Sequence, residues 1–151
     1  MHLHALTESP FRTDDDVQTL LIAFHENVLP RSAWNHRAHM TVALSVGRAH
    51  APDDALTRMR EAINRFNAAI GIVSTPDYGY HETITAFYMH AVALHVRRHP
   101  APTSAAEDAN AFMTEWGRAD LPLDYYSRDL LFSREARAQF VSPDLKHLPD
   151  I

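Results

Sequence analysis

The sequence predicts an all-α fold: a bundle of four to five helices that run up and down, followed by a short helical and extended C-terminal wrap. Apolar residues recur at helical spacing, helix-capping residues stand before these runs, and no segment alternates apolar and polar residues as a strand does. The chain has 151 residues. This length suits one domain over residues 1–151, with its core over about 13–148.

The first helix is expected to begin after Thr13, whose hydroxyl can cap it, with the carboxylates of Asp14 to Asp16 at its positive end. Pro30 follows the apolar run and ends it. The residues expected on the buried stripe of this helix are Val17, Leu20, Leu21, Phe24 and Val28.

A second helix is expected after Ser32, from about residue 33 or 35 to residue 49. Pro52 suits the first turn of a third helix, and Gly71 ends it. The apolar stripe expected for the third helix contains Leu56, Met59, Ile63, Phe66 and Ile70.

A loop over residues 71–80 leads to a fourth helix over about 81–98, which ends before Pro100. Ser104 and Glu107 have the spacing of a capping box and predict the start of a fifth helix. The tail over 121–151 is expected to contain short helices around 125–131 and 133–140 and then an extended, proline-containing end.

Composition argues against several classes of function. The net charge is −5 and no run of Lys or Arg is present, so a nucleic-acid partner is not expected. No apolar run reaches the ~18 residues of a membrane span. The first residues lack the pattern of a signal peptide, so a cytoplasmic location is expected. The chain has no Cys, which removes disulfides, thiolate catalysis and Cys-based zinc sites. No motif points to a nucleotide or flavin.

The 11 histidines are the unusual feature of the chain. At about 100° per residue, both His36 and His39 fall on the buried stripe of the second helix, in its first turn. His81 occupies the first turn of the fourth helix, and Thr85 follows it on the same stripe at the i+4 position. Buried imidazoles at helix starts therefore need either hydrogen-bond partners or a ligand.

Bundle topology brings these histidines to one end of the fold. Short connections favour antiparallel neighbours, so the second and fourth helices run parallel and their N-termini lie together. Two helix N-termini at this end would suit an anionic group on a small-molecule substrate. The pocket expected at this end is lined by Trp34, Asn64, Asn67, Tyr80 and Thr85, in addition to the histidines.

The leading hypothesis is a metal-dependent enzyme that acts on a small molecule. His36, His39 and His81 are the predicted metal ligands, and Glu82 is the predicted general base or fourth ligand. Three protein ligands with an open position are typical of catalytic metal sites. Zn(II) or Fe(II) is favoured, and Mn and Ni are compatible with the same ligands.

Two alternatives stay open. The first is a metal-free acid–base enzyme, a lyase, isomerase or hydrolase, in which His81 and Glu82 are catalytic and Tyr80 or Tyr88 lies nearby. The second is a non-enzymatic module that binds a small ligand among aromatic side chains, including Tyr78, Tyr125 and Tyr126. Both alternative functions are compatible with a homodimer. For any single histidine, ordinary hydrogen bonding in the core is the simpler interpretation.

Several motifs together resemble a family of small bacterial proteins: WNHRAH at 34–39, REAINRFN at 60–67, GYHETIT at 79–85, YSRDLLFSREAR at 126–137 and PDL at 143–145. The resemblance covers about residues 15–148 and implies no particular activity. A looser resemblance is to the DinB/YfiT-like four-helix bundles, which have a three-histidine metal site and include thiol-dependent transferases. Their histidines lie four apart on a late helix, whereas His36 and His39 lie three apart on an early one, so this likeness implies architecture alone.

Overall fold

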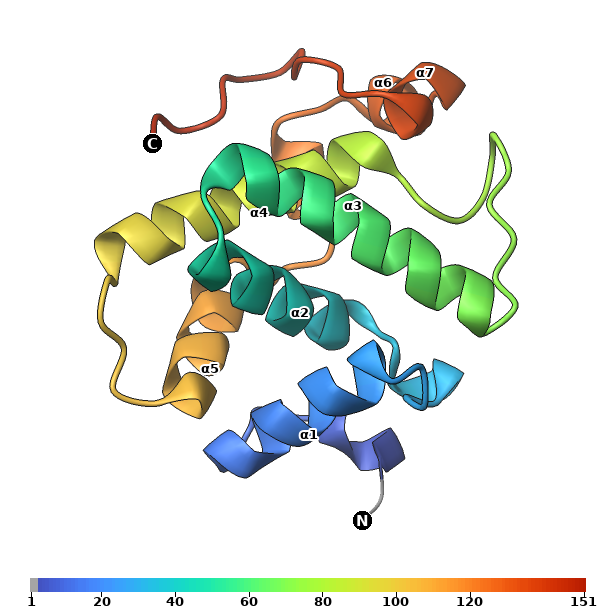
Figure 1. Cartoon of the computed structure of the whole chain (residues 1–151). Helices are drawn as coiled ribbons and strands as arrows, with labels where there is room; N and C mark the ends of the chain where they lie inside the picture. The colour runs from blue at the N-terminus through green and yellow to red at the C-terminus, as the bar shows by residue number, and fades with distance from the viewer. Residues whose placement is uncertain (1–2) are drawn as a thin grey trace.

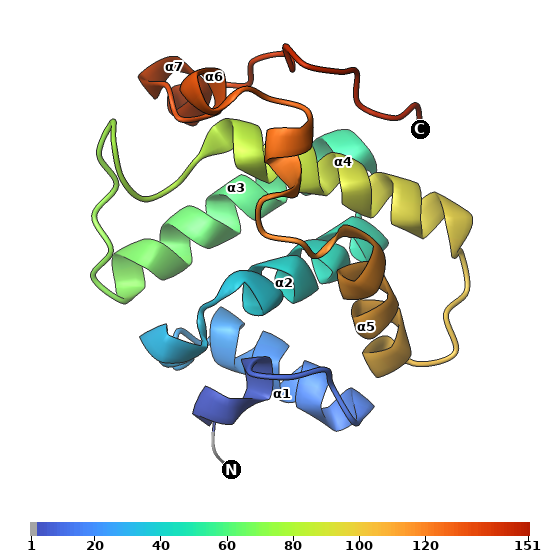
Figure 2. The same cartoon turned by 180° about the vertical axis from the view of Figure 1, so that it is seen from behind.

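The computed structural model describes residues 3–151 and confirms the all-α bundle (Figures 1 and 2). Within these residues no β-strand is formed, and one isolated β-bridge joins Thr75 and Tyr78 in the loop before the fourth long helix. The five longer helices are α1 (Asp14–His25), α2 (His36–Ala49), α3 (Pro52–Ala69), α4 (Glu82–Arg98) and α5 (Ala105–Trp116). The shorter ones are η1 (Leu3–Thr7), η2 (Arg31–Ala33), η3 (Leu121–Asp124), α6 (Arg128–Leu131) and α7 (Arg134–Ala138).

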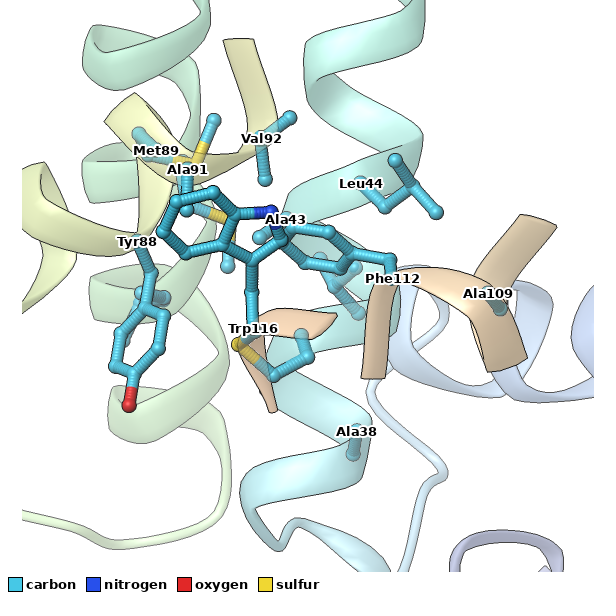
Figure 3. Packing of buried hydrophobic residues seen from close by; sticks show 14 of the residues in the cluster. Ala38, Ala43, Leu44, Tyr88, Met89, Ala91, Val92, Ala109, Phe112 and Trp116 are labelled. Carbon is cyan, nitrogen blue, oxygen red and sulfur yellow. The ribbon is translucent and has the colours of Figure 1, made fainter. Parts of the chain in front are cut away.

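Helix α2 lies at the centre of the bundle and contacts α1, α3, α4 and α5 (Figure 1). In the core, Phe112 and Trp116 of α5 lie among the small and branched side chains of α2 and α4 (Figure 3). The two central helices approach closely at Gly47, where an added Cβ would lie 2.1 Å from Cγ1 of Val92. Glycine at this position therefore allows α2 and α4 to pack at their short separation.

Helix capping follows the expectation at two positions, and at a third the structure identifies the capping residue that the sequence left open. Thr13 accepts a hydrogen bond from the backbone NH of Asp16 at 3.2 Å, and Ser104 accepts one from Glu107 at 3.1 Å. Helix α2 is capped by Asn35, which accepts from the NH of Ala38 at 3.0 Å, and not by Ser32, which lies in η2. Asn35 also donates to the carbonyl of Thr7, so the N-terminal segment fixes this cap in place.

Val28 is a correction to the predicted core. Helix α1 ends at His25, and the turn that follows carries Asn27 at a positive φ of 59°. Val28 therefore leaves the helical stripe and is 57% exposed, whereas Val17, Leu20 and Phe24 are buried as predicted.

The C-terminal segment packs along α4, as the predicted wrap requires (Figure 2). Thr83 donates to the carbonyl of Gln139 at 3.0 Å and accepts from the NH of Val141 at 3.1 Å. Farther along α4, Nε2 of His90 donates to the carbonyl of Pro149 at 2.5 Å. The two predicted tail helices are present but short, as α6 and α7. None of the helices over residues 3–151 is both long and apolar enough to cross a lipid bilayer.

Candidate functional site

A cavity of about 350 Å³ lies between the N-terminal halves of α2 and α4 and the C-terminal half of α3. Its volume is within the usual range for small-molecule sites. The capped N-termini of α2 and α4 meet here, which is why residues far apart in sequence share one wall. The lining residues are Trp34, Asn35, His36, His39, Met40, Ala43, Met59, Ile63, Asn67, Gly79, Tyr80, His81, Ile84, Thr85, Tyr88 and Met89.

Most of the residues predicted to form the site lie on this wall. They are Trp34, His36, His39, Asn67, Tyr80, His81 and Thr85. Asn64 and Glu82 are not among the lining residues. Asn64 lies about one helical turn before Asn67 on α3 and is exposed. Its amide donates to the carbonyl of Arg60 at 2.9 Å.

His39 stacks on Trp34, with ring centroids 3.7 Å apart and planes inclined by 26°. The indole NH of Trp34 donates to the side-chain oxygen of Asn67 at 3.2 Å, and this bond orients the ring on which His39 rests. Burial, followed by the nearby His36, lowers the pKa of His39 to about 3. His39 is therefore neutral at physiological pH, and its ring nitrogens make no hydrogen bond within the described chain.

His36 lies edge-on to Tyr88, with ring centroids 5.2 Å apart. Its Nε2 is buried and has no hydrogen-bond partner of normal geometry. Burial lowers the pKa of His36, and the nearby backbone of Gly117 opposes this effect. The lowered pKa means that the ring is neutral at physiological pH, so one of its two nitrogens carries a lone pair. The ring is thus a neutral hydrogen-bond acceptor on the cavity wall.

His81 uses both ring nitrogens to hold the backbone. Its Nδ1 accepts a hydrogen bond from the NH of Ile84 at 3.1 Å and caps α4, and its Nε2 donates to the carbonyl of Leu131 at 2.7 Å. Burial lowers the pKa of His81, in keeping with a neutral ring. No lone pair of His81 is left for a metal ion in this arrangement.

The three histidines predicted to bind one metal ion are not brought together as a ligand set. Over residues 3–151, the one group whose ligand atoms all lie within 4.8 Å of each other consists of His95, His99 and Glu115. The helical periodicity placed His36, His39 and His81 at the same end of the fold, but their side chains point to different partners. Binding of one metal ion by His36, His39 and His81 stays a prediction, which this arrangement of the side chains does not favour.

Glu82 is turned away from the cavity and bound to Arg60. Its two carboxylate oxygens accept from Nε and Nη2 of Arg60 at 2.8 and 2.6 Å. Oε1 also accepts from the hydroxyl of Tyr80 at 2.6 Å. Arg60 lowers the pKa of Glu82, and burial raises the pKa of Tyr80. An ionised carboxylate with three donors is a weak base, so Glu82 is not placed to act as the predicted general base.

Apolar residues, rather than charged ones, dominate the rest of the wall. Met40 and Ile84 are part of it. Met59 and Ile63 were predicted as core residues because they lie on the apolar stripe of the third helix, and sequence periodicity could not show that they border a cavity. Arg60 and Glu82, which are each next to a lining residue in sequence, neutralise each other, whereas Arg37, next to His36, contributes to the lowered pKa of that histidine. The expectation of an anionic substrate stays a prediction.

The aromatic residues predicted for a ligand-binding module have other roles. The hydroxyl of Tyr78 accepts from Arg31 at 3.2 Å on the surface. The hydroxyl of Tyr126 donates to the carbonyl of Val141 at 2.7 Å, and Tyr125 is buried against Phe87. None of these three tyrosines lines the cavity.

A comparison of this chain with protein-family models, with curated proteins and with solved structures found no match.

Proposed function

We propose that the protein binds a small, uncharged and largely apolar molecule in the cavity, with the polar end of that molecule held by His36 and His39. The observation that supports this proposal is the pair of neutral imidazoles on one wall, whose accessible nitrogens have no protein partner. Mostly apolar pockets with a few convergent polar groups are typical of small-molecule sites. Here those groups are His36, His39 and the amide of Asn67.

We also propose an acid–base role for His36 in an enzyme that acts on this molecule. A neutral imidazole has a lone pair on one ring nitrogen, with which it can accept a proton from a hydroxyl or an acidic C–H group of a bound substrate. His39 has a pKa of about 3, so it is too weak a base for this step and serves as a hydrogen-bonding group. In this proposal, His36 of α2 has the acid–base role that the sequence predicted for His81 and Glu82.

A metal-dependent enzyme is the second candidate. Two neutral imidazoles three residues apart on α2 can bind Zn(II) or Fe(II), but a third protein ligand is missing because His81 is engaged with Ile84 and Leu131. Water or substrate would have to complete the coordination. Elemental analysis of untagged wild-type protein and of His36→Ala separates this candidate from the first: stoichiometric metal lost in the variant supports it.

The binding proposal is tested by nuclear magnetic resonance of the imidazole nitrogens during titration with phenol. Phenol combines an apolar ring with one hydroxyl, and toluene and benzoate are the matched probes without the hydroxyl and with a charge. We expect phenol at millimolar concentration to shift the signals of His36 and His39 more than either control does. Benzoate shifting them most would support an anionic ligand instead.

A variant with a filled cavity tests whether phenol binds inside the cavity. Ile84→Trp places a large side chain in the lining and should abolish the phenol-induced shifts, whereas Ile22→Trp changes an isoleucine that is 54% exposed on α1 and should leave them unchanged. If phenol shifts neither histidine in the wild type, or shifts them equally in Ile84→Trp, the proposed binding site is wrong.

A further inference from the structure

A second cluster of ligating side chains lies where α4 ends beside α5, on helix segments that do not line the cavity (Figure 1). His95 and His99 lie one helical turn apart at the end of α4, and Glu115 lies near the end of α5. One nitrogen of each histidine and one carboxylate oxygen of Glu115 lie within 4.8 Å of each other. The two rings are 4.6 Å apart between centroids.

The neighbours of His95 determine which of its nitrogens is free. Nε2 donates to Oδ1 of Asp108 at 2.7 Å, and the Asp108 carboxylate is held by two further hydrogen bonds from Arg48 at 2.8 and 2.7 Å. The hydrogen therefore sits on Nε2, and the lone pair is on Nδ1. Nδ1 is buried without a partner, in a side chain that is 1% exposed.

A buried acceptor without a hydrogen-bond partner is unfavourable, so it points to a missing partner. A histidine that donates one NH to a carboxylate and presents its other nitrogen to an ion is the usual arrangement of metal-binding histidines, because the carboxylate fixes the tautomer and makes the ligand more basic. Asp108, itself fixed by Arg48, has this orienting position beside His95.

We propose that His95, His99 and Glu115 bind a divalent metal ion of the Zn²⁺ type, with water in the remaining position. Two imidazoles and one carboxylate suit the ligand preference of Zn²⁺, which accepts three protein ligands and a solvent molecule. Glu115 currently accepts from Arg98 at 3.1 Å, and both side chains are exposed. The ion therefore replaces Arg98 as the partner of Glu115.

Such an ion joins the end of α4 to the end of α5 across the connection over residues 99–104. Because the folded chain brings the three ligands together and the unfolded chain does not, bound metal stabilises the fold by mass action. The role we infer is thus structural, and it is independent of chemistry in the cavity.

The test is calorimetric titration of untagged protein with ZnCl₂. Wild type should bind one equivalent. The exposed-residue variants His99→Gln and Glu115→Gln should bind at least ~10-fold more weakly, since the loss of even a residue that only orients a metal ligand has an effect of this order. His50→Gln is the control for a surface histidine, and His36→Gln is the control for the cavity. Both should bind Zn²⁺ as wild type does.

Arg98→Ala provides a test with the opposite sign. Removal of the guanidinium frees Glu115, so this variant should bind Zn²⁺ more tightly than wild type. Absence of binding to wild type, equal binding by His99→Gln and Glu115→Gln, or a loss of binding in His36→Gln would each overturn the proposed site. The absorption spectrum of the Co²⁺ form reports four-coordinate geometry in the wild type and its loss in His99→Gln.

Discussion

Arg60 of α3 and Glu82, the first residue of α4, form a two-point ion pair with nitrogen–oxygen distances of 2.8 and 2.6 Å. The Glu82 side chain is 10% exposed and that of Arg60 is 39% exposed, so the pair closes the outer side of the contact between the two helices. Tyr80 completes it by donating to the same carboxylate. A residue first considered as a catalytic base therefore joins two helices.

Glu82→Gln should lower the free energy of unfolding at pH 7 by about 1–2 kcal/mol, the range for losing hydrogen bonds to a charged group when the remaining partner can recover water. Glu61→Gln on the exposed face of α3 is the matched control and should change stability by less than ~0.5 kcal/mol. Urea unfolding of the three proteins measures the difference. Equal stability of the two variants would contradict a joining role for Glu82.

The effect of Glu82→Gln should also depend on pH. The pKa of Glu82 is lower in the folded protein than its ordinary value of about 4.3. A lowered carboxylate pKa gives stability that is complete above the unfolded pKa and is lost as the pH falls through the folded one. The difference between wild type and variant should be constant from pH 8 to pH 5 and should shrink below ~4.3. A difference that grows in acid would exclude this linkage.

Substitution of His81 separates its two backbone contacts. His81→Ala removes both the cap of α4 and the bond to Leu131, for a cost of about 2–3 kcal/mol. His81→Asn should recover the cap, because Asn is a preferred N-cap residue, but it is too short to reach Leu131. We therefore expect the stability of His81→Asn to lie between those of wild type and His81→Ala. Addition of a chelator should not change this order.

His39 should make the protein less stable in mild acid. The pKa of His39 falls to about 3 on folding, so the unfolded chain binds the proton first as the pH drops below ~6.5. Stability is then lost with falling pH, by about 2 kcal/mol between pH 7 and pH 5. His39→Gln should show a shallower loss over this interval in urea unfolding, since the carboxylates titrate alike in both proteins. Identical slopes would contradict a buried neutral His39.

Gly47→Ala should destabilise the protein by about 1–3 kcal/mol through overpacking, although alanine is the better helix former by ~1 kcal/mol. The added methyl group would collide with Val92. Val92→Ala removes the obstacle, so the double variant should be more stable than the sum of the two single changes predicts. Simple additivity would show that close packing at this crossing does not explain the glycine.

Much of the fold follows from local sequence signals. The apolar stripes and the caps at Thr13 and Ser104 predicted α1, α3 and α5, because these features depend on residues within one or two turns. The start of α2 was left open between residues 33 and 35, and the cap at Asn35 is supported by its bond to Thr7, a contact across 28 positions. Distant partners of this kind leave no periodic signal.

In the candidate site, too, local features were predictable from the sequence and contacts with distant residues were not. Helical geometry placed His36 and His39 on the inner face of α2, and the structure places both on the cavity wall. Helical geometry alone could not assign side-chain partners, so the bonds of His81 to Leu131 and of Glu82 to Arg60 were missed. The cluster at His95 was also missed, although His95 and His99 have the i, i+4 spacing that brings ligands onto one helix face.

The contacts of the C-terminal segment with α4 bear on how the protein reaches its final form during synthesis. Thr83 and His90 find their acceptors at Gln139 and Pro149, which the ribosome adds 41 and 51 residues after Arg98, the last residue of α4. Until that segment has been made, these two polar groups of α4 must remain hydrated. The outer face of α4 is therefore completed only after residue 149 has emerged.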